Sequence, residues 1–203
     1  MKVKLLACTQ AYNAIGLESA QDLIAYCARV SNPANQMNTE TSEKLIKYLI
    51  KHKHWSPLEM ASATMEVETT RDIARQLLRH RSFSFQEFSQ RYADPTKEMG
   101  DAFVLREARL QDTTNRQNSV ETDDSRLQML WSAQQNKVIT AAKEAYQWAI
   151  DNGIAKEQAR AVLPEGNTKS TLYANGTQKE HMELAIECGK AIAEIFPLVK
   201  DLK

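Results

Sequence analysis

Residues 75–92 read RQLLRHRSFSFQEFSQRY, a stretch in which a helical pattern runs into a cluster of charged and polar side chains. Helical spacing extends over 71–81, and its inner positions are Ile73, Ala74, Leu77 and Leu78. The quartet Ser84-Phe85-Gln86-Glu87 has the pattern of a capping box, which predicts a second helix through Phe88 and Tyr92. A tight turn at 82–84 would join the two helices.

Arginine recurs every four residues on the first of these predicted helices. At ~3.6 residues per turn, Arg71, Arg75 and Arg79 share one stripe, and Gln76 and His80 share the adjoining one. Guanidinium groups this close repel one another unless anions lie between them, and their planar fork suits phosphate. The pattern predicts a phosphorylated ligand, although such clusters are also typical of a solvated face with weak ion pairs.

The second predicted helix carries a charged pair of its own. Glu87 and Arg91 are i,i+4 partners on it, and Ser89 lies between them in sequence. The ends of the two helices would therefore bring Arg, His, Glu and Ser side chains around one cleft.

The flanking sequence predicts both strands and helices. Strands are predicted over 2–9 and over 60–70, where Ala61, Ala63, Met65 and Val67 alternate with polar residues. Helices are predicted over 20–30, 42–52, 127–150, 155–163 and 179–196, and a capping box at Ser56-Pro57-Leu58-Glu59 predicts one short turn more. We therefore expect an α+β fold, with a twisted, mainly antiparallel sheet flanked by helices and a helical extension.

The longest of these helices has an apolar pattern of its own. Its predicted inner positions are Leu127, Leu130, Trp131, Val138, Ala141, Ala145 and Trp148. Asn152-Gly153 predicts a left-handed stop. The polar residues 94–122 before this helix are expected to be mostly loop.

Composition suits one globular domain spanning residues 1–203. The chain has 203 residues, of which 42% are hydrophobic and 26% charged, and its formal net charge is +0. That balance argues against binding to nucleic acid or to an anionic membrane. Three widely spaced cysteines indicate reduced thiols, and no leader or membrane span is evident, so we expect a cytoplasmic protein. With four histidines, including His52 and His54, and no completing cluster, no metal site is expected.

Four segments together resemble the flavin-dependent thymidylate synthases. Arg79-His80-Arg81 followed by seven residues and Ser89 resembles the signature RHR-x7-S of that family. KHKHWSPLEM (51–60) resembles the family segment HGHxTPFEH, ARQLLRHR (74–81) resembles ARQxxRHR, and ARAVLP (159–164) resembles ARxVLP. The resemblance extends from about residue 20 to the C-terminus.

The resemblance implies an enzyme that methylates dUMP to dTMP. The carbon donor would be 5,10-methylenetetrahydrofolate, and FAD reduced by NADPH would supply hydride; no cysteine lies near the motif to act as a nucleophile. It also implies a homotetramer with active sites shared between subunits. The two rival classes are an Arg-rich nucleic-acid-binding regulator and a flavin-binding scaffold with weak catalysis.

Site residues follow from the same resemblance. Contacts with dUMP are implied for Gln76, Arg79, Glu87, Ser89, Arg91 and Arg160. Contacts with FAD are implied for Ser56, Glu59, Arg79, His80, Arg81 and Glu87. Ser89 and Arg79 would belong to the catalytic centre, with Ser89 positioning the uracil. Arg91 and Arg160 would hold the phosphate.

One family segment has no counterpart here. After Tyr173 the family has a helical stretch of the kind RSxxxFxxLR, whereas this chain reads Ala174-Asn175-Gly176-Thr177. That stretch carries an arginine that contacts the uracil. Either the segment has been deleted, or it belongs to the molecule and is missing from the 203-residue sequence. Because the sequence on both sides looks intact, we expect the second.

Overall fold

The computed structural model describes residues 1–12, 15–81 and 83–176. The chain forms two compact units, each described by itself below. Of the described residues, the first comprises those within Met1–Glu68, Gln76–Glu87 and Thr171–Gly176, and the second comprises Thr69–Arg75 and Phe88–Ser170. The helix predicted over 179–196 lies outside the described residues.

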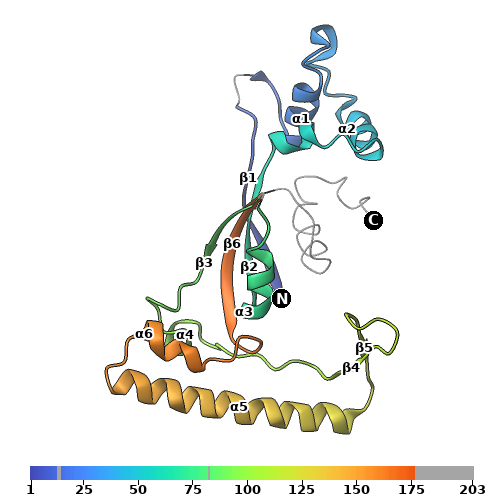
Figure 1. The fold of residues 1–203 in the computed structure, drawn as a ribbon. Helices are drawn as coiled ribbons and strands as arrows, with labels where there is room; N and C mark the ends of the chain where they lie inside the picture. The colour runs from blue at the N-terminus through green and yellow to red at the C-terminus, as the bar shows by residue number, and fades with distance from the viewer. Residues whose placement is uncertain (13–14, 82, 177–203) are drawn as a thin grey trace. The chain divides into compact units, whose positions relative to one another are not determined.

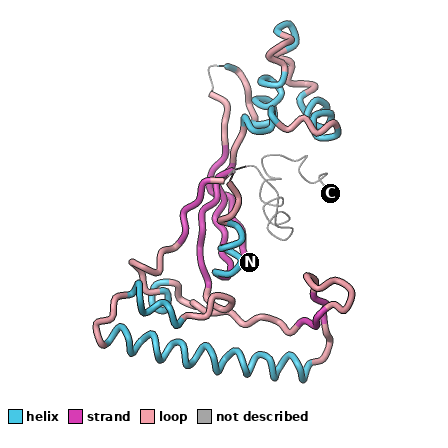
Figure 2. The backbone as a smooth tube through the Cα atoms, in the orientation of Figure 1, coloured by secondary structure: helices cyan, strands magenta, loops and turns pink. Residues whose placement is uncertain are grey.

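A four-stranded sheet runs through the first unit. Its strands are β1 (Lys2–Cys8), β2 (Ala63–Thr70), β6 (Lys169–Gly176) and β3 (Ser84–Glu87), in the order β1-β2-β6-β3 (magenta in Figure 2). β1 pairs with β2, and β3 pairs with β6, both in antiparallel fashion. Ala63, Met65 and Val67 are buried on β2, as their alternation predicts. With the flanking helices, this sheet confirms the α+β prediction.

β3 corrects one prediction. Residues 84–87 form a strand rather than the capped start of a helix, and they pair with β6 from Ser84↔Asn175 to Glu87↔Leu172. The backbone groups of the short quartet are satisfied by β6, a strand that the sequence analysis did not predict. The signal for β6 was present, since Ser170, Leu172 and Ala174 alternate with less buried residues.

Two predicted helices of the first unit form, and they share a small core. α1 (Ala20–Ala28) begins at Ser19, whose hydroxyl accepts the N–H of Asp22 at 3.1 Å, and α2 (Ser42–Lys51) packs beside it (Figure 1). The buried side chains are Ala20, Ile24, Ile46 and Ala61. The 3-10 helices are η2 (Pro33–Asn35) and η3 (Ser56–Met60).

The capping box predicted at Ser56 is wrong. The short turn of helix does form there, but its N-cap is Trp55, and no side chain makes a cap hydrogen bond. Pro57 near the start of the turn, with its fixed φ, accounts for the turn without a cap.

The second unit is built on α5 (Ser125–Asp151), the long yellow helix of Figure 1. Asp124 caps it by accepting the N–H of Leu127 at 2.9 Å, and Gly153 after it has φ 76° in the predicted left-handed stop. Its buried residues are Gln135, Ile139, Ala142, Tyr146 and Ala149.

The inner face predicted for this helix is wrong. Leu130, Trp131, Val138 and Trp148 are exposed in the single chain, with Trp148 62% exposed. The buried face is instead set by the core of the second unit, in which Ile139 and Tyr146 lie with Phe103 and Leu163.

The other elements of the second unit are short. They are α3 (Arg71–Leu77), which continues into the first unit, α4 (Pro95–Glu98), β4 (Arg109–Gln111), β5 (Ser119–Glu121), α6 (Lys156–Ala159) and η4 (Arg160–Val162). β4 and β5 form an antiparallel hairpin inside the predicted loop 94–122. Among the described residues, no helix is long and apolar enough to cross a membrane.

Candidate nucleotide and flavin site

Two of the arginines expected to bind phosphate lie around one glutamate in the second unit. Arg91 Nη2 lies 3.2 Å from Glu157 Oε2, and Arg160 Nε donates to the backbone carbonyl oxygen of Glu157 at 3.1 Å. The side chains of Arg91 and Glu157 are 53% and 49% exposed. The two guanidinium groups thus share a partner that solvent, or an anionic ligand, can reach.

Hydrogen bonds hold the turn that carries Arg91 and attach it to α6. Arg91 lies in a turn in which the N–H groups of Tyr92 and Ala93 both donate to the Ser89 carbonyl at 3.1 Å. The ammonium of Lys156, at the start of α6, donates to the Tyr92 carbonyl at 2.9 Å. α6 is thereby attached to the turn that carries Ser89, which is itself half-buried.

The partner of Arg91 differs from the predicted one. Glu87 is on strand β3 and Arg91 is in the turn after it, so the expected i,i+4 helical pair does not exist. Glu157 takes the place of Glu87, and it was not among the predicted site residues. Its signal was its i,i+3 spacing from Arg160 in the predicted helix 155–163.

The first unit carries the residues of the RHR motif. α3 ends at Leu77, four residues before the predicted end, and single turns follow, with Arg79 N–H donating to the Gln76 carbonyl at 3.2 Å. Gln76, Arg79 and Arg81 are exposed, and His80 is half-buried. Glu87, at the end of β3, is half-buried.

The ring of His80 lies near a pair of stacked aromatic rings. Its ring centroid lies 6.1 Å from that of Phe83, which stacks on Phe85 at 5.6 Å. Ring faces of this kind, with the exposed Arg79 and Arg81 close to them in sequence, are chemically suited to a planar, negatively charged ligand.

Ser56 and Glu59 are exposed on η3, also in the first unit. Nearby in sequence, the exposed ring of Tyr48 lies 4.2 Å from that of His52 and 6.2 Å from that of His54. The structure thus places Ser89, Arg91 and Arg160 in the second unit and the other predicted site residues in the first.

The predicted arginine stripe is only partly available to ligands. Arg71 is 4% exposed, and its Nε lies 3.4 Å from a carboxylate oxygen of Glu165, so it serves the interior of the second unit. A surface stripe of phosphate-binding arginines is therefore interrupted, which weakens the nucleic-acid alternative. The described ranges contain no group of three or more His, Cys, Asp or Glu residues that could hold a metal ion.

Comparison with known proteins places the chain in one class of enzyme. Residues 14–177 match the family model described as thymidylate synthase complementing protein. The chain is 43% identical over 215 positions to a probable flavin-dependent thymidylate synthase of Paramecium bursaria Chlorella virus 1, covering 98% of this chain and 97% of the relative. It is also 43% identical over 197 positions to a flavin-dependent thymidylate synthase of Synechocystis sp., covering 89% and 88%.

A solved structure agrees with the sequence matches. The UMP/dUMP methylase PolB from Streptomyces cacaoi, bound with 5-Br dUMP, is similar with a TM-score of 0.77 and 27% identity, over 98% of this chain and 93% of that chain. The chain belongs to the thymidylate synthase complementing protein family, that of the flavin-dependent thymidylate synthases. The resemblance seen in Arg79-His80-Arg81 and Ser89 is confirmed.

The two alignments also bear on the missing segment. The alignment with the viral relative spans 215 positions, of which this chain fills about 199, or 98% of its 203 residues. The alignment with the Synechocystis relative spans 197 positions, of which this chain fills about 181, or 89% of its residues. Both relatives therefore carry about sixteen residues that have no counterpart in this chain. In the sequence, Gly176 at the end of β6 is followed directly by Thr177. A gap of this size fits the family segment that the resemblance places after Tyr173.

Proposed function

We propose that this chain methylates dUMP at uracil C5 to give dTMP, as one catalytic domain spanning residues 1–203. Family membership and the likeness to a dUMP methylase support the reaction. The structural observation that carries it is the group Arg91, Glu157 and Arg160, in which an exposed and a half-buried arginine share one glutamate, and Arg91 follows the half-buried Ser89 in the same turn.

The two guanidinium groups suit the phosphate of dUMP. A phosphate dianion is the stronger partner for Arg91 and can replace the exposed carboxylate of Glu157, while Arg160 stays oriented by its bond to the Glu157 backbone. Ser89 would position the uracil. Gln76, Arg79 and Glu87 complete the proposed contacts with the nucleotide.

FAD fits the residues of the first unit. Exposed Arg79 and Arg81 are suited to its pyrophosphate, and the ring of His80 lies at the edge of the Phe83 and Phe85 stack. Ser56, Glu59 and Glu87 are proposed as further contacts with FAD. Once bound, NADPH-reduced flavin supplies hydride and 5,10-methylenetetrahydrofolate supplies the carbon. The chain's own groups orient the pyrimidine and stabilise negative charge that develops on its ring.

A homotetramer with shared active sites is part of the proposal. The exposed apolar side chains of α5, Leu130, Trp131, Val138 and Trp148, form the kind of surface that another subunit covers. Light scattering after size-exclusion chromatography would give the mass of a tetramer. We place the protein in the cytoplasm, consistent with Cys8 and Cys27 being free thiols.

A visible absorption spectrum of the purified protein tests the class of function. The proposed enzyme shows bound flavin and oxidises NADPH faster when dUMP is present. A scaffold would show flavin without a response to dUMP. A nucleic-acid-binding regulator would show no flavin, and either result would overturn the proposal.

A further inference from the structure

We propose that Arg106 is a positioning residue for nucleotide binding, because it ties together two segments that lead to nucleotide-binding side chains. The inference rests on the proposed function. The two segments are the start of α3 and the turn formed by residues 164–168, and all the contacts involved lie within the second unit.

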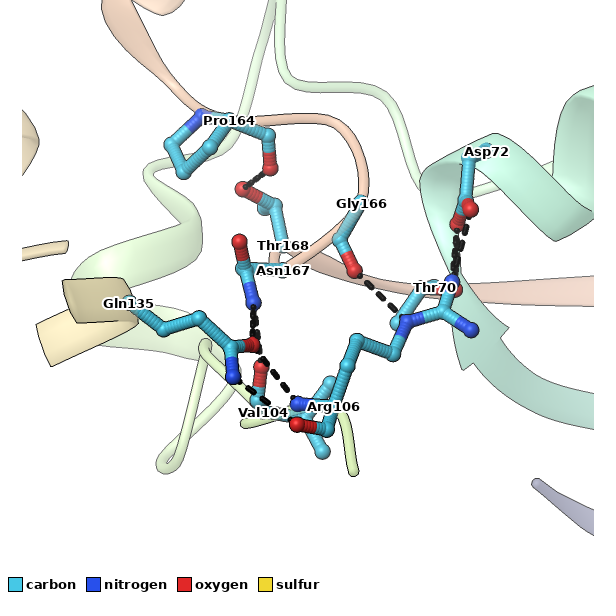
Figure 3. A network of polar contacts seen from close by, with 9 residues as sticks. All are labelled: Thr70, Asp72, Val104, Arg106, Gln135, Pro164, Gly166, Asn167 and Thr168. Atoms are coloured by element: carbon cyan, nitrogen blue, oxygen red, sulfur yellow. Dashed lines mark hydrogen bonds and ion pairs between the residues drawn. The ribbon is translucent and has the colours of Figure 1, made fainter. Parts of the chain in front are cut away.

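The side chain of Arg106 reaches both segments (Figure 3). Its Nη2 donates to Thr70 Oγ1 at 2.8 Å and to the Asp72 carboxylate at 2.8 and 2.6 Å. Its Nε donates to the carbonyl oxygen of Gly166 at 3.0 Å. One planar guanidinium group therefore fixes the start of α3 against the turn, which a single ammonium could not do.

The start of α3 is also bound to this turn through its backbone. The N–H of Arg71 donates to the Thr168 carbonyl at 2.9 Å, and the N–H of Asp72 donates to the Glu165 carbonyl at 3.4 Å. These are N–H groups of the first helical turn, which have no partner inside a helix. The first residues of α3 are therefore bonded to the same turn that Arg106 holds.

The turn itself is well ordered by hydrogen bonds. The hydroxyl and the N–H of Thr168 both donate to the Pro164 carbonyl, at 2.7 and 2.9 Å. Asn167 Nδ2 donates to Gln135 Oε1 and to the Val104 carbonyl, each at 2.9 Å (Figure 3). The segment held by Arg106 thus has little freedom of its own.

Both tied segments lead to proposed nucleotide contacts. α3 continues to Leu77, with Gln76 in its last turn and Arg79 just after it. The turn follows η4, which begins at Arg160. The side chain of Arg106 is bonded to Thr70, Asp72 and Gly166, so it would act on nucleotide binding through these segments, as a positioning residue.

The ion pair between Arg106 and Asp72 adds little to the stability of the fold. The side chains of Arg106 and Asp72 are 39% and 41% exposed, and an ion pair so accessible to water stabilises a fold little. The four hydrogen bonds instead restrict geometry. Loss of Arg106 should therefore affect ligand affinity more than the melting temperature.

The test compares Arg106→Met and Arg106→Lys with Arg109→Met in the FAD-loaded full chain. Arg109 is a matched control because it bonds Glu107, Ser119 and Glu121 on the exposed hairpin. Calorimetry gives the Kd for dUMP, steady-state assays separate KM from kcat, and circular dichroism gives Tm. We expect dUMP binding about 10-fold to 100-fold weaker in Arg106→Met, partly recovered in Arg106→Lys, and unchanged in Arg109→Met.

Each outcome decides one point. Weaker binding by the Arg106 variants at an unchanged Tm supports the inference, and if Arg106→Met fails to fold, Arg106→Lys carries the same comparison. Wild-type affinity in every folded Arg106 variant overturns the inference alone. If the wild type binds FAD but shows no affinity for dUMP, the proposed function fails, and the inference fails with it.

Discussion

Gln135 on α5 holds both backbone groups of Arg106, accepting its N–H at 2.7 Å and donating to its carbonyl at 2.8 Å. Gln128, seven residues earlier on the same helix, does the same for Ala108, at 2.7 and 2.9 Å. Two side-chain amides thus replace the edge of a neighbouring strand for residues 106–108. The backbone of Arg106 is therefore held by bonds that are separate from those of its side chain.

Replacing Gln135 by Leu should lower the free energy of unfolding by about 2–3 kcal/mol, because the Arg106 backbone groups lose their partner. Gln135 is 4% exposed, so water does not reach the site freely. Urea unfolding would measure the loss. Gln134→Leu, at an exposed position of the same helix, should change stability by less than about 0.5 kcal/mol. Equal stabilities of the two variants would contradict the role given to Gln135.

Local patterns predicted much of the fold, but they failed where pairing is distant in sequence. The strands predicted over 2–9 and 60–70 formed as Lys2–Cys8 and Ala63–Thr70, and the helices predicted over 20–30 and 42–52 formed as Ala20–Ala28 and Ser42–Lys51, because their periodicity is local. The prediction for residues 84–87 was wrong because the partners of β3, at 172–175, are almost 90 residues away in sequence. A four-residue segment is also too short for its periodicity to distinguish a strand from a helix.

The candidate site shows the same contrast between local patterns, which could be predicted, and contacts distant in sequence, which could not. Arg91 and Arg160 were predicted through motifs, whereas Glu157, which contacts both, was not predicted, because an acid near an arginine is common on any helix. The face of α5 was misassigned because apolar residues outline an exposed stripe, whereas a glutamine lies in the interior. A buried amide can be recognised only when its backbone partners are known.

Tyr146→Phe should leave the fold at least as stable as the wild type at neutral pH. Tyr146 is fully buried, and within the described ranges its hydroxyl has no hydrogen-bond partner, so removing it relieves a desolvated group. Burial, and then the charges of Asp94 and Glu98, raise the pKa of Tyr146 to about 12.

The same variant predicts a pH dependence. Tyrosine in the unfolded chain ionises near pH 10, whereas folded Tyr146 keeps its proton to about pH 12, so the wild type loses stability between these values. Denaturant unfolding across this window should show a smaller loss for Tyr146→Phe. Parallel curves for the two proteins would refute the shifted pKa.

Lys53→Gly should stabilise the first unit by about 1 kcal/mol, because only glycine adopts positive φ without steric cost. Lys53 has φ 57° and is the sole non-glycine residue with positive φ in the described part of the chain. The family segment HGHxTPFEH, which residues 52–60 resemble, has glycine at the position of Lys53. Thermal unfolding would show a higher Tm, whereas Lys47→Gly within α2 should lower it. A decrease in both variants would argue against strain at Lys53.

The rate of dTMP formation tests the effect of the family segment that is missing after Tyr173. A chain without the family segment after Tyr173 lacks the arginine that the resemblance places against the uracil, so we expect weak dTMP formation together with clear flavin binding. Product would be quantified chromatographically with dUMP, methylenetetrahydrofolate and NADPH present. A rapid yield of dTMP would show that other residues of this chain supply the missing function.

The most direct test of the account is a titration of the FAD-loaded protein with dUMP, followed by the visible spectrum of the flavin. We predict a saturable spectral change in the wild type, because the proposed reaction requires the nucleotide to bind beside the flavin ring. In Arg91→Met, which lacks one phosphate contact, the change should require about 10-fold or more dUMP. A flavin spectrum that stays the same at every dUMP concentration would contradict the account.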